Sequence, residues 1–253
     1  MGVHTLYSGH FGGVIRLQGA TKGDYFAALA FAGVLVALHE WVRTRRWWMG
    51  ALIFLNAILL VFSGGRMGVF AAFVGALVYF IRAPEARNAL WRLKGWAYLG
   101  AAAMGAAMVV YAPIMVDRMY GLGGDQFNFS GRRIIWASYL DKFRKSIWFG
   151  RGLGAGQEGV FDPNFPHNEY LRFVVEGGLV GAVILLLAIC LWAWRMHGHL
   201  ATNDRPFFTA FMVAIAFYAF TDNPLSATYL SGFVYLGLLR SEGWEAQKAP
   251  PES

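Results

Sequence analysis

Apolar residues gather along the chain into seven blocks separated by short polar or basic stretches. Each block approaches the length of a membrane-spanning helix, which needs about 20 mostly apolar residues. Hydrocarbon leaves backbone polar groups without partners, so such blocks must be helical. The pattern predicts an all-α fold: a polytopic bundle of transmembrane helices that forms a single membrane domain over residues 1–253. The predicted spans are Tyr25–Val42, Trp47–Ser63, Met67–Ile81, Trp96–Val116, Gly178–Trp194, Phe207–Thr221 and Leu225–Leu239.

Composition supports a membrane protein and argues against other classes. Hydrophobic residues make up 57% of the chain and charged residues 15%, whereas a soluble domain has about 25% charged residues. The net charge of +7 lies mostly beside the apolar blocks, which predicts contact with membrane lipid and not with nucleic acid. Cys190 is the single cysteine of the chain, so neither an intrachain disulfide nor a thiolate metal cluster is expected.

The basic residues also predict the orientation of the spans. Short cytoplasmic loops carry an excess of lysine and arginine. If the turn at 43–46 is cytoplasmic, the basic stretches at 82–94, at 195–205 and after 240 are cytoplasmic as well, and all four agree. The large loop at 117–177, between the fourth and fifth spans, is then predicted to lie outside the cytoplasm.

Two features stand out within this large loop. Apolar residues recur at helical spacing at Ile135, Tyr139, Phe143 and Ile147, with charged residues on the opposite face. This spacing predicts an amphipathic helix that lies at the membrane interface or packs on the bundle. The glycine-rich run at 150–156 that follows predicts a tight loop, because so many glycines disfavour regular helix.

Arginines at the non-cytoplasmic ends of helices are candidate ligands for an anion, since a charge beside hydrocarbon is costly and often functional. Arg66 stands between two apolar blocks, and the alternative for it is snorkelling to a lipid phosphate. Arg132 and Arg133 open the amphipathic helix, where a cation opposes the helix dipole; a solvated face is the alternative. Arg16, before the first span, is the weakest of these candidates.

His167 is the candidate general base on the same side of the membrane. A histidine titrates near neutrality and can take a proton from a hydroxyl, although a lone loop histidine can also be structural. The other histidines do not form metal-ligand spacing with carboxylates on one side, so no metal site is predicted. Polar neighbours on the same side are candidate supporting residues, or else act in capping and solvation: Asn168, Glu169, Glu176 and Asp222.

Five short motifs follow one another along the chain. They are Ser63-Gly64-Gly65-Arg66, Ser130-Gly131-Arg132 with Trp136 after it, Gly150-x-Gly152-x-Gly154, His167-Asn168-x-Tyr170-Leu171, and Glu176-Gly177-Gly178-Leu179-Val180-Gly181. Each motif is weak singly. Their order, their spacing and the large non-cytoplasmic loop resemble the O-antigen ligase and polymerase family over residues 16–181.

The resemblance implies a multi-pass glycosyltransferase of the bacterial inner membrane, active on the periplasmic face in polysaccharide or lipopolysaccharide biosynthesis. Its donor would be a glycan on a polyprenyl-diphosphate carrier, and its acceptor a hydroxyl of a saccharide, of lipid A-core or of a protein. No metal or other cofactor is implied. Arg66 and Arg132 resemble the family's arginines, His167 resembles its catalytic histidine, and Arg16 is a weaker match to an earlier arginine.

The chemistry of such a transfer fits these residue types. Arginines can stabilise the growing charge of a diphosphate leaving group as bidentate donors where no cation is bound. A positioned base helps to deprotonate the acceptor hydroxyl. Attack opposite the leaving diphosphate would invert the anomeric centre.

Family members usually have more spans than the seven predicted here, so the resemblance is to their C-terminal part. Three explanations stay open: Met1 is an internal start of a longer gene, a partner chain supplies the missing helices, or the chain is an inactive, truncated member that acts as an assembly subunit. A lipid-linked glycan flippase is a further alternative. It would need charged or broken-helix features near the bilayer midplane, which these spans almost lack.

Overall fold

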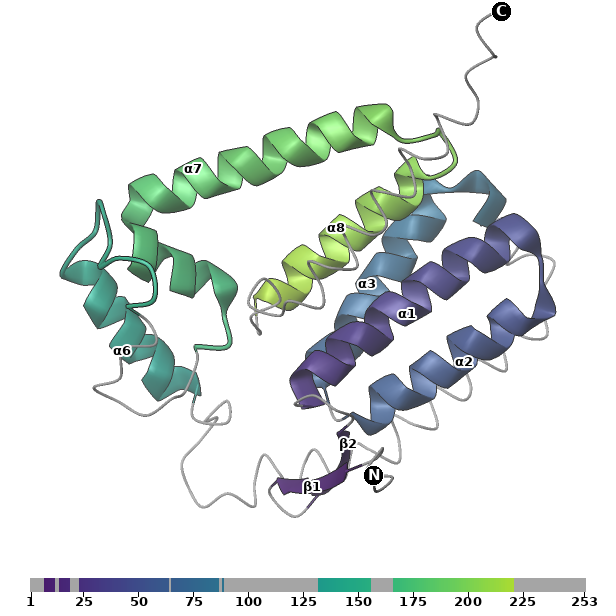
Figure 1. Cartoon of the computed structure of the whole chain (residues 1–253), viewed down its shortest axis with the longest axis horizontal. Helices are drawn as coiled ribbons and strands as arrows, with labels where there is room; N and C mark the ends of the chain where they lie inside the picture. The colour runs from purple at the N-terminus through teal and green to yellow at the C-terminus, as the bar shows by residue number, and fades with distance from the viewer. Residues whose placement is uncertain are drawn as a thin grey trace, which may run out of the picture.

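The computed structural model describes residues 7–11, 14–18, 23–63, 65–86, 88, 132–155 and 166–220. Within these ranges the chain is mainly helical, with one short β ribbon (Figure 1). The helices are α1 (Gly23–Thr44), α2 (Trp47–Phe62), α3 (Arg66–Arg82), α6 (Arg132–Arg144), α7 (Glu169–His199) and α8 (Arg205–Ala219). The strands are β1 (Tyr7–Phe11) and β2 (Val14–Gln18).

The helices confirm most of the predicted elements. α1, α2, α3, α7 and α8 cover the first, second, third, fifth and sixth predicted spans, and α6 is the predicted amphipathic helix. α7 begins at Glu169 and not at Gly178, because Asn168 caps the helix and a kink at Gly178 joins two segments. The predicted spans Trp96–Val116 and Leu225–Leu239 lie outside the described residues.

The short β ribbon before α1 is an addition to the predicted helical bundle. β1 and β2 pair antiparallel, with Phe11 opposite Val14, so that only Gly12 and Gly13 separate the strands. A Gly-Gly pair between short alternating segments is a typical hairpin signal. This signal is present in the sequence, but it is much shorter than the apolar blocks that predict the helices.

Two described helices are long and apolar enough to cross a membrane, namely Phe26–Thr44 of α1 and Glu169–His199 of α7. α2, α3 and α8 are shorter apolar helices. The number of spans and the side on which each loop lies stay predictions.

Small residues let the helices of the bundle approach closely. Ala27, Ala28 and Phe31 of α1 are buried against α2, α3 and α8. A Cβ on Gly65 would clash with the Cβ of Ala27, and one on Gly75 would lie 2.8 Å from Leu35 Cδ1. Small residues at helix contacts are typical of membrane bundles, where backbones must come close for packing to stabilise the association.

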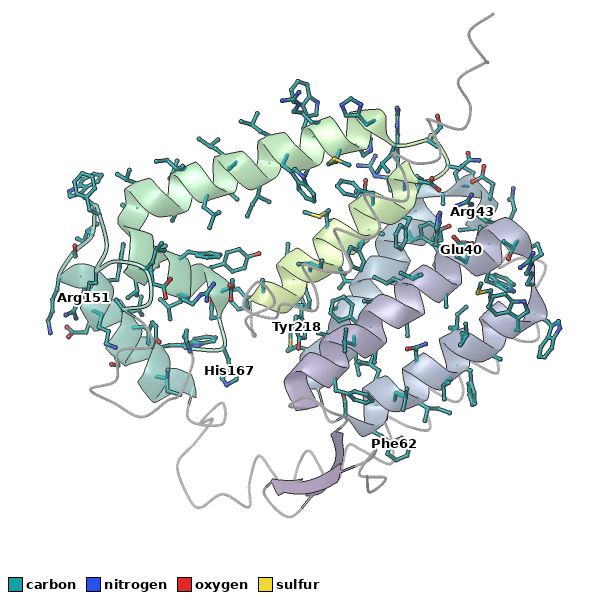
Figure 2. All side chains as sticks on the ribbon, viewed as in Figure 1. Glu40, Arg43, Phe62, Arg151, His167 and Tyr218 are labelled. Carbon is teal, nitrogen blue, oxygen red and sulfur yellow. The ribbon has the colours of Figure 1, made fainter. Side chains whose placement is uncertain are left out.

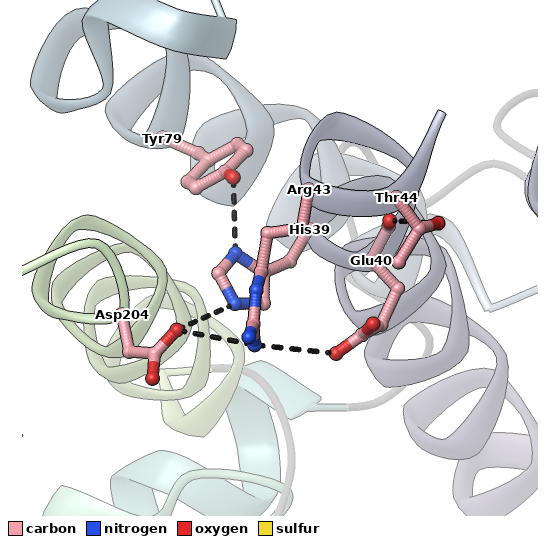
Figure 3. A network of polar contacts seen from close by, with 6 residues as sticks. All are labelled: His39, Glu40, Arg43, Thr44, Tyr79 and Asp204. Atoms are coloured by element: carbon pink, nitrogen blue, oxygen red, sulfur yellow. Dashed lines mark hydrogen bonds and ion pairs between the residues drawn. The ribbon is translucent and has the colours of Figure 1, made fainter. Parts of the chain in front are cut away.

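A polar network joins three helices at one end of the bundle (Figure 3). His39 of α1 hydrogen-bonds through Nδ1 to the Tyr79 hydroxyl of α3 at 3.0 Å, and through Nε2 to the Asp204 carboxylate at 3.1 Å. Arg43 also donates to Asp204, which lies at the start of α8. The network therefore brings together the ends of the helices that carry the basic stretches predicted to be cytoplasmic.

The opposite end of the bundle holds the described parts of two segments predicted to lie outside the cytoplasm, the turn at 63–66 and the residues that lead into α7. Figure 2 shows Phe62 and His167 at this end and Arg43 at the other. Tyr170, in the first turn of α7, donates its hydroxyl hydrogen to the backbone oxygen of Ala216 near the end of α8 at 2.7 Å. The start of α7 therefore lies beside the end of α8, so these two helices run antiparallel.

Candidate functional site

His167 lies in the short segment that leads into α7, and its side chain is half-buried. Its φ is +46°, in the left-handed region that non-glycine residues rarely adopt. Before it, the Trp136 indole Nε1–H donates to the Pro166 carbonyl at 2.7 Å. After it, the Asn168 side-chain oxygen accepts from the Leu171 backbone N–H at 2.9 Å. The histidine backbone is therefore fixed between α6 and the first turn of α7.

Buried charges lie directly behind this segment. Glu169 is only 1% exposed and forms an ion pair with Arg172, one turn along α7. Glu176 is buried as well, and Tyr139 of α6 is buried near it. Burial and then the charge of Glu176 raise the pKa of Tyr139, whereas Arg172 lowers it. Breaking a buried ion pair leaves an uncompensated charge, so this cluster favours a single arrangement of α6 and the start of α7.

The two glycine motifs of the large loop meet at the kink of α7. Gly178 has φ +65° and ψ −170°, so the helix cannot continue its own hydrogen bonding through this point. The loop after α6 supplies the missing partners. Arg151 N donates to Val175 O at 3.0 Å, Gly152 N to Glu176 O at 3.0 Å, Leu179 N to Ile147 O at 2.8 Å, and Val180 N to Trp148 O at 3.1 Å.

The Ser63–Arg66 motif forms the turn between α2 and α3. Ser63 is fully buried, and its hydroxyl donates to Leu60 O at 2.6 Å and accepts from Gly65 N–H at 3.2 Å. Gly65 precedes α3 and packs against Ala27, as described above. The motif therefore places Arg66 as the first residue of α3, at the same end of the bundle as the start of α1.

The four candidate arginines all lie in described elements. Arg132 and Arg133 are the first two residues of α6, one turn before Trp136, so the structure brings the start of α6 to the His167 segment. Arg66, Arg132 and Arg133 each begin a helix, where the partial positive charge of the N-terminus adds to their own charge in attracting an anion. Arg16 lies in β2 opposite Gly9, on the α1 and α2 side of the molecule (Figure 1).

Three of the four predicted supporting residues lie near His167, and the fourth lies outside the described residues. Asn168, Glu169 and Glu176 all lie beside His167 or behind it, in capping and buried positions. Asp222 lies outside the described residues. Within the described ranges, no group of three or more His, Cys, Asp or Glu side chains is placed to hold a metal ion.

A model of one protein family, described as O-antigen ligase, matches residues 51–186. This match covers more than half of the chain, from α2 to the part of α7 beyond its kink. The chain belongs to the O-antigen ligase family. At the family level it is therefore a membrane-embedded, O-antigen ligase-like or polymerase-like glycosyltransferase of polysaccharide biosynthesis, with a lipid-linked glycan donor and a saccharide acceptor. No curated protein and no solved structure matches the chain.

The range that matches the O-antigen ligase family contains Arg66, Arg132 and His167, whereas Arg16 and Asp222 lie outside it. Two contacts in the site of this family member were not predicted from the sequence. Trp136 was expected only as part of a motif, and its hydrogen bond to Pro166 links elements 30 residues apart. Arg172 was missed, although its i, i+3 spacing from Glu169 after a capping asparagine was a usable signal.

Proposed function

We propose that this O-antigen ligase family member transfers a glycan from a polyprenyl-diphosphate carrier to a hydroxyl acceptor, with His167 as general base. The observation that carries the proposal is the constrained backbone of His167, which has φ +46° between a carbonyl bonded to Trp136 and a helix-capping asparagine. Strained conformations of non-glycine residues concentrate at functional sites, where surrounding contacts hold them in place.

Arg66 and Arg132 are the proposed ligands of the donor diphosphate. Both begin helices at the end of the molecule where His167 lies, and Arg132 is one turn from the residue that holds the His167 segment. A planar guanidinium can donate two parallel hydrogen bonds to phosphate oxygens. Arg133 is the next residue of α6 and adds positive charge to the same helix end.

The bonds, the proton and the electron pair of the proposed reaction are all accounted for by donor, acceptor and His167. The acceptor oxygen attacks the anomeric carbon, and its proton passes to the imidazole of His167. The bond between that carbon and the diphosphate oxygen breaks, and its electron pair leaves with the diphosphate, whose charge the arginines stabilise. Attack from the face opposite the leaving group inverts the anomeric centre. We place this chemistry on the periplasmic face of the bacterial inner membrane, because Arg43 and Arg82 lie in the last turns of α1 and α3, at the end of the bundle away from His167, and basic helix ends favour the cytoplasmic side.

Paired arginine variants test the assignment of the diphosphate ligands. Each test variant has a matched control at the other end of its own helix: Arg66→Ala against Arg82→Ala in α3, and Arg132→Ala against Lys142→Ala in α6. A charged hydrogen bond contributes about 1.5 to 3 kcal/mol, so loss of one should weaken binding of lipid-diphosphate glycan by at least about tenfold. Lysine should restore binding only in part.

The controls should bind donor like the parent, because they lie away from the proposed site. Donor binding is measured on the purified protein in nanodiscs, with folding checked by thermal unfolding. If folded Arg66→Ala and Arg132→Ala proteins bind the donor as tightly as their controls, the two arginines do not hold the diphosphate.

A further inference from the structure

The loop that follows α6 exposes large apolar side chains. Trp148 is 65% exposed, Phe149 78% and Leu153 91%, and Ile147 beside them is exposed as well. We call residues 147–153 the aromatic loop. Large apolar side chains are also exposed on α2, α3 and α7, where lipid contact is expected. Here they lie together in a loop outside the helices, and a contiguous apolar group of this kind marks an interaction surface.

Backbone bonds fix the aromatic loop to α7. Ile147 O accepts from Leu179 N, and Trp148 O accepts from Val180 N. Leu179 and Val180 form the first turn after the kink, where the apolar part of α7 begins. Figure 1 shows the loop beside this kink, at one end of the long segment of α7. The loop is therefore held beside the residues where the predicted span Gly178–Trp194 begins.

Basic residues lie next to the exposed aromatic ones along the chain. Arg144 and Lys145 precede the aromatic loop, Arg151 lies within it, and all three are exposed. Figure 2 shows Arg151 on the outer edge of the molecule. Tryptophan prefers the interface between hydrocarbon and headgroups, and each lysine or arginine near an anionic bilayer is attracted to lipid phosphates. Aromatic and basic residues together therefore fit the headgroup region of an anionic bilayer.

We propose that the aromatic loop inserts into the leaflet on its own side of the membrane and binds anionic phospholipid. The buried residues Tyr139, Glu169 and Glu176, together with the ion pair between Glu169 and Arg172, couple this loop to the segment before α7, because α6 and the start of α7 pack together. The membrane anchor therefore sets the height of His167 above the bilayer. This surface is independent of the proposed roles of His167 and the arginines, because it concerns lipid and not donor or acceptor.

Site-specific quenching tests the insertion. Phe149→Cys and Leu153→Cys are labelled with an environment-sensitive fluorophore after Cys190 is replaced by serine. The matched control is Ala137→Cys, an exposed position in α6 on the face opposite Tyr139. The proteins are reconstituted into phosphatidylcholine and phosphatidylglycerol vesicles that contain a spin-labelled lipid quencher. We expect quenching at 149 and 153 to be at least about twice that at 137.

Removing positive charge from the protein, or negative charge from the vesicles, tests whether the loop prefers anionic lipid. Replacing Arg144, Lys145 and Arg151 together by alanine, or omitting phosphatidylglycerol, should reduce quenching at 149. Equal quenching at 149, 153 and 137 would overturn the insertion. Disulfide cross-linking between two copies of the unlabelled Phe149→Cys protein, without quenching by lipid, would show instead that a second copy covers the loop. None of these measurements needs glycan transfer, so their failure is distinct from failure of the proposed function.

Discussion

Gly150 and Gly178 approach each other so closely that neither position has room for a side chain. A Cβ on Gly150 would clash with the backbone of Gly178, and a Cβ on Gly178 would lie 2.5 Å from Gly150 N. Both residues also have positive φ, +67° and +65°. Two glycine motifs that are separate in sequence thus form one joint, which fixes the loop after α6 to the kink of α7.

Gly178→Ala should open this joint. The added methyl group meets the carbonyl of Trp148, and alanine disfavours the left-handed region, so we expect a loss of at least about 2 kcal/mol of unfolding free energy. Gly181→Ala is the matched control in the same helix, because nothing lies within 4 Å of its Cβ position. The control should be neutral or slightly stabilising. Thermal unfolding in detergent compares the two, and equal midpoints would contradict a close joint.

Trp136→Phe should slow glycan transfer without removing the aromatic packing of α6. The variant loses the hydrogen bond to Pro166, which is worth about 0.5 to 1.5 kcal/mol, so the protein should stay folded. Misplacement of a catalytic group by about 1 Å can cost about a hundredfold in rate, and we expect kcat to fall at least tenfold while donor affinity is unchanged. Trp194→Phe, at an exposed site farther along α7, is the control. A Trp136→Phe enzyme with parental kcat would show that this bond does not position His167.

The sequence was sufficient to predict the elements whose signal is local. Long apolar blocks predicted α1, α2, α3, α7 and α8. Apolar residues at helical spacing predicted α6, because residues at that spacing share one face of a helix. The tight loop predicted for the glycine run is confirmed over its described residues, 150–155. Its partner at Gly178 could not be inferred, since the contact depends on tertiary packing across 28 positions.

In the candidate site, too, the residue types could be read from the sequence, whereas the contacts between elements could not. The residue types of Arg66, Arg132 and His167 suggested donor binding and proton transfer, and their roles stay predictions. The burial of Glu169, its ion pair with Arg172 and the bond from Trp136 to Pro166 depend on how α6 packs against α7. No spacing rule within one segment predicts those contacts.

The orientation of the bundle can be measured directly. With Cys190 replaced, a cysteine at Ala137 should react with a membrane-impermeant maleimide only from the non-cytoplasmic side, and one at Thr202 only from the cytoplasmic side. Right-side-out and inverted vesicles distinguish the two. Labelling of Ala137→Cys in inverted vesicles alone would place the His167 segment in the cytoplasm and would remove the basis for a periplasmic transfer.

The most direct test of the account is glycan transfer by a His167→Ala protein, produced from its own locus and assayed in membranes of the native host. His199→Ala is the matched control, because His199 is an exposed residue at the opposite end of α7. General-base assistance contributes about a hundredfold to ten-thousandfold, so His167→Ala should lose at least about 99% of transfer while it still binds donor. Transfer at the parental rate by His167→Ala, with normal protein levels, would contradict the proposed role.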